Sequence, residues 1–132
     1  MAPIALGKAD LLKPSHIVII DDDDSVRNAM KNLIRALGYS VDAFGSARAF
    51  LDSNTIQTAS CLISDIHMPE MSGVELQRQL SAAGHRTPII FMTGRPDDVT
   101  RARVIGDGAI AYLGKPLCER SLLASLNQAI NH

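Results

Sequence analysis

Five short apolar runs that alternate with helical patterns constrain the fold of this chain more than any other feature. Each run predicts a β-strand, at residues 16–20, 40–44, 61–64, 88–92 and 109–113. Between and after them lie five helical patterns, at residues 26–37, 46–53, 72–83, 96–106 and 119–130. Because strands that alternate with helices pair in parallel, we expect an α/β fold: one doubly wound, five-stranded parallel sheet with helices on both faces.

Length and composition indicate one globular domain and exclude several classes of protein. The chain has 132 residues and a formal net charge of −1, so no overall field attracts it to nucleic acid or to an anionic membrane. No apolar run approaches the roughly 20 residues of a membrane span, and no secretory signal is evident, which predicts a cytoplasmic location. Cys61 and Cys118 lie far apart in the sequence and form no CxxC pair, so we expect both to be small packing residues. We expect residues 1–15 to be a flexible extension and residues 16–130 to form the domain.

Polar residues follow the predicted strands at their carboxyl ends. Right-handed crossovers bring these ends to one edge of the sheet, where open α/β sheets carry their chemistry. Each residue alone has an ordinary explanation as a turn residue, a helix cap or a solvated side chain. The residues that converge on this edge are Asp21, Asp22, Asp65, Thr93 and Lys115.

Three carboxylates at one rim need neutralisation. At about 4–5 Å each pair repels by about 3–4 kcal/mol at an effective dielectric of about 20, which summed over three pairs is comparable to the stability of a domain. Lys115 supplies one cation, and hard carboxylate oxygens at a wet rim suit Mg²⁺, with Mn²⁺ as an alternative. A metal, a lysine and the Thr93 hydroxyl around Asp65 suit phosphoryl transfer, with that carboxylate as the nucleophile.

The chain resembles the receiver domain of bacterial response regulators over residues 16–130. The resemblance rests on the acidic pair after the first strand and on residues 62–73, 91–94 and 112–116. It implies a flavodoxin-like sheet with strand order 2-1-3-4-5. It also implies a two-component switch in which Asp65 accepts a phosphoryl group from the phosphohistidine of a sensor histidine kinase or histidine phosphotransferase. Slow self-dephosphorylation follows, so the protein is not expected to be an enzyme that turns over a free substrate.

The resemblance also assigns metal ligands by position. Asp65 and Asp22 would bind Mg²⁺ directly, Asp21 largely through water, and His67 through its backbone carbonyl. The run of four aspartates leaves this register open by one residue. We choose Asp21 and Asp22 because Asp24 stands where the first helix needs an N-terminal cap, which leaves Asp23 solvated.

The same resemblance implies a conformational switch. Phosphorylation would draw Thr93 inward and let Tyr112 fill the space it leaves, while a cis bond between Lys115 and Pro116 aims the lysine. The 96–106 helix has a sparse apolar face of Val99, Ala102 and Ile105, so we expect it to be the element that moves. The altered face would comprise this helix, the last strand and the last helix.

The partners implied are a kinase and an unknown effector. The kinase would dock on Val26, Met30 and Leu117, and phosphorylation could produce a homodimer through the altered face, which carries the arginines Arg95, Arg101 and Arg103. The output stays open between a stand-alone receiver and the first part of a longer DNA-binding regulator. We expect neither nucleic acid nor a membrane to bind this chain directly.

Two other classes of protein compete with this interpretation. Residues 21–25 also match the D-x-D-x-[ST] start of haloacid-dehalogenase-type phosphatases, with Asp21 as the nucleophile. Those enzymes need an acidic pair after the lysine, whereas Asp97 and Asp98 precede Lys115, and the length leaves no room for a cap domain. A scaffold without phosphorylation would leave the convergence of the five site residues unexplained.

Overall fold

The computed structural model describes residues 15–130, so most of the predicted 1–15 extension lies outside the described residues. The elements in chain order are β1 (His16–Ile20), α2 (Asp24–Ala36), β2 (Ser40–Phe44), α3 (Ala47–Ser53), a 3₁₀ turn η1 (Thr55–Gln57), β3 (Cys61–Asp65), α4 (Gly73–Ala82), β4 (Ile89–Thr93), α5 (Asp98–Gly106), β5 (Ala111–Gly114) and α6 (Glu119–Ile130). All five predicted strands and all five predicted helices are present. Within this part of the chain, no helix combines the length and apolarity needed to cross a membrane.

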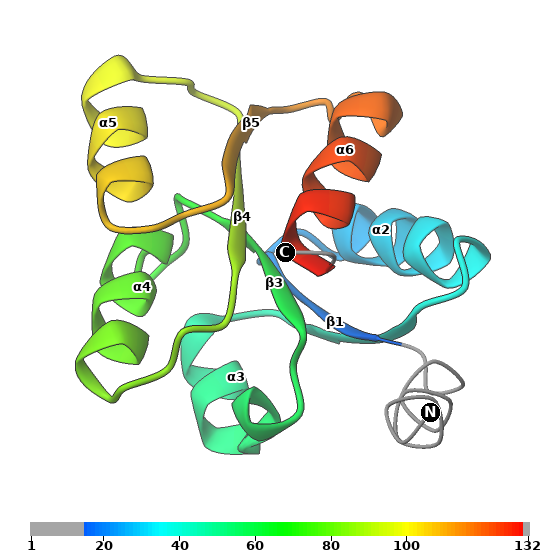
Figure 1. Ribbon diagram of the computed structural model, residues 1–132, viewed down its shortest axis with the longest axis horizontal. Coiled ribbons are helices and arrows are strands. Elements are labelled where there is room, and N and C mark those ends of the chain that lie inside the picture. Colours follow the sequence, from blue (N-terminus) through cyan, green and yellow to red (C-terminus); the bar gives the residue numbers. More distant parts are fainter. Residues whose placement is uncertain (1–14, 131–132) are drawn as a thin grey trace, which may run out of the picture.

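The five strands form one parallel sheet in the order β2-β1-β3-β4-β5. Helices α2 and α6 cover one face, and α3, α4 and α5 cover the other (Figure 1). This confirms both the fold class and the strand order. The central pair, β1 and β3, therefore brings two acidic segments side by side although they are far apart in the sequence.

Alternate side chains of each strand enter two separate apolar cores, because successive residues of a strand point to opposite faces. Ile17 and Ile19 of β1 pack with α2 and α6, whereas Val18 and Ile20 pack with the helices of the other face. All four side chains have no exposed surface. Burial on both faces explains why β1 reads as an unbroken apolar run and not as an alternating pattern.

Helix α5 buries fewer residues than any other α-helix of the described chain. Val104 is its only buried residue. The predicted apolar face is wrong, since Val99 is 77% exposed, Ile105 is 42% exposed and Ala102 also faces solvent. The helix is short and is capped by the Asp97 side chain, so it docks on the sheet with only Val104 in the core. Val99, Ala102 and Ile105 therefore stay on the solvent side.

Two smaller predictions also need correction. The last strand begins at Ala111 and not at residue 109, because Gly108, at φ 105°, and the Ala109 N–H bonded to the Val104 carbonyl still belong to the end of α5. Cys61 is buried as expected, whereas Cys118 is exposed. Cys118 lies just before α6, and hydrogen bonds from Ser121 lower the pKa of its thiol.

Candidate functional site

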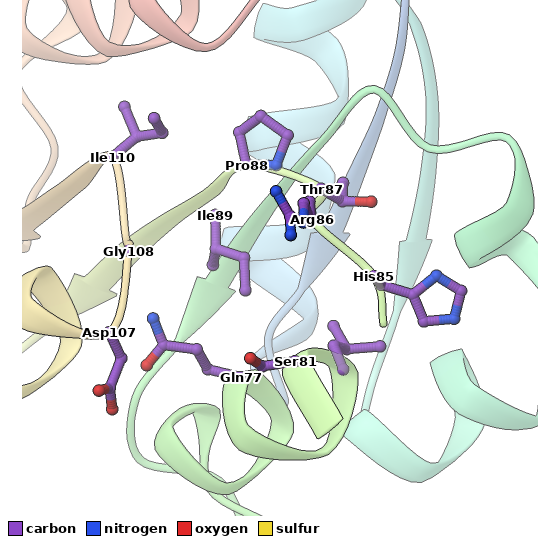
Figure 2. Close-up of a pocket in the computed structure, with 11 residues that line it drawn as sticks. Gln77, Ser81, His85, Arg86, Thr87, Pro88, Ile89, Asp107, Gly108 and Ile110 are labelled. Atoms are coloured by element: carbon purple, nitrogen blue, oxygen red, sulfur yellow. The ribbon is translucent and has the colours of Figure 1, made fainter. Parts of the chain in front are cut away.

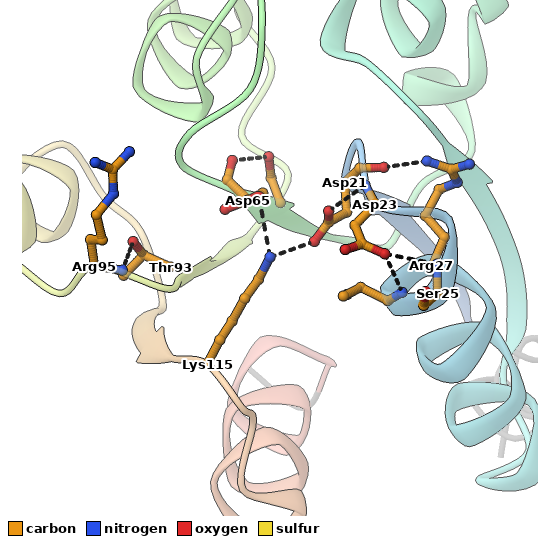
Figure 3. A network of polar contacts seen from close by, with 10 residues as sticks. Asp21, Asp23, Ser25, Arg27, Asp65, Thr93, Arg95 and Lys115 are labelled. Carbon is orange, nitrogen blue, oxygen red and sulfur yellow. Dashed lines mark hydrogen bonds and ion pairs between the residues drawn. The ribbon is translucent and has the colours of Figure 1, made fainter.

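The strand register assembles the predicted site at one edge of the sheet. Ile20 pairs with Ser64, so the residues that follow them, Asp21 and Asp65, stand on adjacent strand ends. Thr93 ends β4 and pairs with Gly114, which directly precedes Lys115. Figure 3 shows Asp21, Asp65 and Lys115 pointing toward one another from three different segments.

Three carboxylates form a tight group at this edge. Asp21, Asp22 and Asp65 each offer a ligand oxygen, and these atoms lie within 4.8 Å of one another. Asp21 has no exposed surface and Asp65 has 6%, whereas Asp22 is exposed. The group therefore has a buried side that faces the sheet and one carboxylate that faces solvent.

Lys115 neutralises part of this charge. Its Nζ donates to Asp21 Oδ2 at 2.9 Å and to Asp65 Oδ2 at 3.2 Å. Burial alone would lower the pKa of Lys115, but the hydrogen bonds and negative charges of the two aspartates outweigh it and raise that pKa. The lysine is thus held in its charged form between the two carboxylates.

The electrostatics of Asp65 differ from those of an ordinary surface aspartate. Burial raises the pKa of its carboxyl group, and the charge of Asp21 raises it further, while Lys115 and the backbone N–H of His67 act in the opposite direction. A carboxylate that is partly stripped of water and close to another negative charge gains from any added cation. A bound cation would therefore stabilise the charged form of Asp65.

Besides Asp22, the three other aspartates of the run each take a different role. Asp21 accepts from Lys115 and from the Asp23 N–H, which is 2.9 Å from its Oδ1. Asp23 is the N-cap of α2, since its carboxylate accepts from the N–H groups of Ser25 and Val26, and these bonds lower its pKa. Asp24 is the first residue of the helix and pairs with Arg27.

The predicted cap residue is therefore wrong: Asp23 caps the helix and Asp24 does not. The physical reason is that the Arg27 N–H bonds to the Asp23 carbonyl, so the first helical turn already closes on Asp23. The helix therefore begins one residue earlier than a cap at Asp24 would place it, and Asp23 occupies the cap position. The choice of Asp21 and Asp22 as the pair beside Asp65 matches the observed acidic group.

Arg27 holds the acidic loop in place and was not predicted. Its Nη1 donates to the Asp21 carbonyl at 2.7 Å (Figure 3). Its Nη2 pairs with the Asp24 carboxylate. Gly45 leaves room for it, because a Cβ there would lie 3.2 Å from Nη1. The one signal in the sequence is the three-residue spacing of Asp24 and Arg27, which suits a pair on one helix face.

Gly73 allows α4 to begin directly beside Asp65. A Cβ at this position would lie 2.4 Å from the Asp65 carbonyl oxygen and 3.0 Å from a ring atom of Phe91. The Gly73 N–H bonds to the Ile66 carbonyl at 2.8 Å. A capping box between Ser72 and Glu75 then starts the helix.

Thr93 and Tyr112 lie on neighbouring strands and are both buried. The Thr93 hydroxyl oxygen accepts from the Arg95 N–H at 3.0 Å, and the Tyr112 hydroxyl oxygen accepts from the Asp97 N–H at 3.0 Å. Both hydroxyls therefore fix the loop that leads into α5. The Lys115–Pro116 peptide bond is cis, and the Lys115 N–H bonds to the Thr93 carbonyl.

The donor set of this edge fits Mg²⁺. It consists of carboxylate oxygens without a neighbouring cysteine or histidine ligand among the described side chains, and one of them, Asp22, is open to solvent. Lys115 contributes one positive charge against three negative ones, so a divalent cation would complete the neutralisation. The side chain of His67 is exposed, which is compatible with the predicted role of its backbone carbonyl.

Comparison with known proteins identifies the family. The model of the response regulator receiver domain matches residues 17–127. TodT, a response regulator protein of Pseudomonas putida, is 41% identical over 118 residues, which cover 89% of this chain and 52% of TodT. The transcriptional regulatory protein FixJ of Bradyrhizobium diazoefficiens is 35% identical over 115 residues, which cover 87% of this chain and 56% of FixJ. The chain thus spans about half the length of these curated relatives.

Solved structures agree with the sequence relatives. The response regulator StyR matches with a TM-score of 0.83 at 38% identity, over 89% of this chain and 60% of StyR. The structure FixJ-N matches with a TM-score of 0.81 at 28% identity, over 92% of this chain and 97% of that chain. None of these matches supports the phosphatase alternative, and the complete burial of Asp21 disfavours it as a nucleophile. This chain belongs to the response regulator receiver domain family.

Proposed function

We propose that Asp65 accepts a phosphoryl group from the phosphohistidine of a sensor histidine kinase or histidine phosphotransferase in the cytoplasm. The observation that carries this proposal is the position of the Asp65 carboxylate, 3.2 Å from the Lys115 ammonium and beside two further carboxylates. A carboxylate oxygen of Asp65 attacks phosphorus, the P–O bond forms, and the P–N bond breaks with its electron pair left on the partner's imidazole. Later attack by water on phosphorus would release inorganic phosphate and restore Asp65.

The residues of this chain would divide the work of charge neutralisation. Asp22 and Asp65 would hold Mg²⁺, or Mn²⁺, directly, Asp21 would act largely through water, and His67 would add its backbone carbonyl. A bound divalent ion supplies neutralisation of the charge on the phosphoryl oxygens. Lys115 donates to Asp21 and Asp65 and would pair with a phosphoryl oxygen. Two cations of different kinds would then act on one group.

The Thr93 hydroxyl is the proposed sensor of phosphorylation. Its oxygen accepts from the Arg95 N–H, so its proton remains available to donate. A phosphoryl group on Asp65 offers new acceptor oxygens on the adjacent strand end. If the hydroxyl turns toward them, the loop that precedes α5 loses one of its bonds.

Helix α5 is proposed to respond because few contacts hold it. These are the buried Val104 side chain, the bond that the Asp97 N–H donates to the Tyr112 hydroxyl oxygen, and the guanidinium of Arg101 over the Tyr112 ring at 5.1 Å. A fourth contact is the hydrogen bond that Gln77 Nε2 donates to the Val104 carbonyl. A shift of the Thr93 loop therefore acts on an element with a small energy gap between its arrangements.

An apolar groove next to the site supports the proposed kinase docking surface. It has a volume of about 530 Å³ and lies between α2 and the segment after β5. Its lining includes the predicted docking residues Val26, Met30 and Leu117 and also Lys115. A helix of a partner laid along this groove would bring its phosphohistidine close to Asp65.

The output of the switch is also a proposal. TodT and FixJ are about twice as long as the matched region, and FixJ is named a transcriptional regulatory protein. We propose that the phosphorylated face of α5, β5 and α6 acts on a transcriptional output or forms a homodimer. The exposed arginines of this face, Arg95, Arg101 and Arg103, would then contact an acidic partner surface.

Labelling with acetyl phosphate tests the proposed acceptor. In the presence of Mg²⁺ the protein is expected to gain one phosphoryl group by intact mass, and Asp65→Asn is expected to gain none, because the amide lacks the nucleophilic oxygen. Asp52→Asn serves as the matched control, since Asp52 is exposed on α3, pairs with Arg48 and is not a member of the acidic group. Labelling of Asp65→Asn at the normal rate would contradict the proposal, as would labelling that is unaffected by EDTA.

Hydrogen exchange tests the proposed switch separately. On phosphorylation, amide exchange in residues 94–106 is expected to change by several-fold, while exchange in α3 on the same face of the sheet stays constant. Asp65→Asn with the same phosphodonor should show neither change. Unaltered exchange in residues 94–106 of a fully labelled protein would exclude α5 as the moving element without affecting the assignment of Asp65.

A further inference from the structure

A second cavity lies at the opposite end of the sheet from Asp65. It has a volume of about 290 Å³ and opens between α4, the start of β4 and the turn that joins α5 to β5. Figure 2 shows the Gln77 carboxamide turned from α4 toward the turn that carries Asp107 and Gly108. No residue of the phosphorylation site lines this cavity.

Gln77 is an unusual residue to find on its wall. The side chain is only 4% exposed, and its Nε2 donates to the Val104 carbonyl at 3.0 Å. Its oxygen has no hydrogen-bond partner within residues 15–130. Exchanging the two amide atoms would place the oxygen against the Val104 carbonyl, so the observed orientation is the favourable one. A buried acceptor is thus left without a donor, which is uncommon in folded proteins.

The groups around this acceptor select the kind of donor that would satisfy it. Asp107 is the only acidic residue of the lining, and Ser81 lies on the next turn of α4. The apolar side chains of Leu80, Ile89 and Ile110 complete the wall. An unpaired amide oxygen, a carboxylate and a hydroxyl on apolar walls suit an N–H donor that carries positive charge on a short hydrocarbon stem.

We propose that this cavity binds an alkylguanidinium or alkylammonium group. One N–H of the ligand would donate to Gln77 Oε1, which has almost no accessible surface in the free protein, so a small shift of the wall must open the path to it. The ligand's charge would face the Asp107 carboxylate. An anion is disfavoured at this end, because Asp107 would repel it and the amide oxygen could not donate to it. Arg86 and His85 line the other end of the cavity, away from Gln77 and Asp107 (Figure 2). The ligand could be a free small amine or guanidine, or a side chain that another polypeptide presents.

A ligand bound in this cavity would contact the end of helix α5. The Val104 carbonyl, which accepts from Gln77, also accepts from the Ala109 N–H at 2.9 Å and so closes the end of α5. Asp107 is the C-cap residue of the same helix. A ligand between Gln77 and Asp107 would therefore tie α4 to the end of α5, and this inference does not depend on the proposed phosphorylation.

Titration with methylguanidinium, followed by amide chemical shifts, tests the site. We expect saturable shifts centred on residues 77–81 and 107–110 at millimolar concentrations, as suits so small a ligand. Gln77→Met keeps the volume but removes the acceptor, and Asp107→Asn removes the charge; each should weaken binding about tenfold. Gln79→Met is the matched control, because Gln79 is exposed on the same helix and lines neither this cavity nor the adjoining one.

The outcomes separate the sources of the ligand and can overturn the site. Comparable binding of N-acetylarginine amide would indicate a side chain presented by a polypeptide, whereas binding of methylguanidinium alone would indicate a free small molecule. Shifts that stay linear with concentration, or that are unchanged in both Gln77→Met and Asp107→Asn, would refute the proposal. Asp107 is exposed, so its variant keeps the test valid even if Gln77→Met fails to fold.

Discussion

Replacing Gly73 by alanine is expected to lower the free energy of unfolding by about 3 kcal/mol, the upper end of the usual effect of overpacking. The added Cβ would lie 2.4 Å from the Asp65 carbonyl oxygen and 3.2 Å from the Ile66 Cα, which are backbone atoms, and 3.0 Å from the fully buried ring of Phe91. Either α4 or the end of β3 must move. Urea unfolding followed by circular dichroism measures the loss as a lower midpoint at unchanged slope.

Gly106→Ala is the matched control for this substitution. Gly106 is the last residue of α5, a Cβ there meets nothing within 4 Å, and the residue has no left-handed backbone conformation. Alanine at this position should leave stability unchanged or raise it by up to about 1 kcal/mol. Equal unfolding midpoints for the two variants would show that the close approach of Gly73 to Asp65 carries no energetic weight.

Lys115→Met is expected to lower the free energy of unfolding by about 2–3 kcal/mol at pH 7 in EDTA. The substitution keeps most of the side-chain volume but leaves the carboxylates of Asp21 and Asp65 facing each other without their cation. Lys31→Met on α2 is the control, because no ion pair of the described residues involves Lys31. A loss no larger than that of the control would show that the lysine does not neutralise the cluster.

The cost of Lys115→Met should depend on pH and on magnesium. The pKa of Asp65 is raised in the folded protein, so the folded state binds this proton more tightly than the unfolded state does. Stability is therefore lost as pH rises through that pKa and regained as pH falls through it, and removing the lysine enlarges this effect. Thermal melts should show the variant approaching the parent protein on acidification and on addition of Mg²⁺.

Most of the fold could be predicted from the sequence, for an identifiable reason. Strands buried on both faces, such as β1 and β3, read as unbroken apolar runs, and Met30 and Ile34 mark the buried stripe of α2. Gly38, at φ 96°, closes α2 where the sequence predicted its end. The strand order came from the resemblance, because local patterns do not encode which strands are neighbours.

The errors occurred where several local explanations fit the same residues. Any of the aspartates 22–24 can cap a helix, and the bond between the Arg27 N–H and the Asp23 carbonyl shows that Asp23 does so. On α5, Val99 and Ile105 show helical spacing, but the helix docks through Val104. With so few apolar residues in a short helix, the spacing alone does not show which of them faces the core.

The sequence indicated which residues gather at the candidate site, but not which residues hold them in place. Asp21, Asp65 and Lys115 could be placed together because parallel strands share one carboxyl edge. Arg27 could not be found in this way, since its guanidinium acts through a backbone carbonyl. Gln77 was missed for a similar reason, because its partner in α5 is also a carbonyl, 27 residues away.

The ion pair between Lys115 and Asp21 joins residues that are 94 positions apart in the chain. Contacts of such long range form late, after the intervening strands have found their places. A misassembled chain would therefore lack the proposed acceptor site even though every residue of it has been synthesised. If Asp65 is the acceptor, as proposed, phosphorylation would report that the sheet has assembled from its first strand to its last.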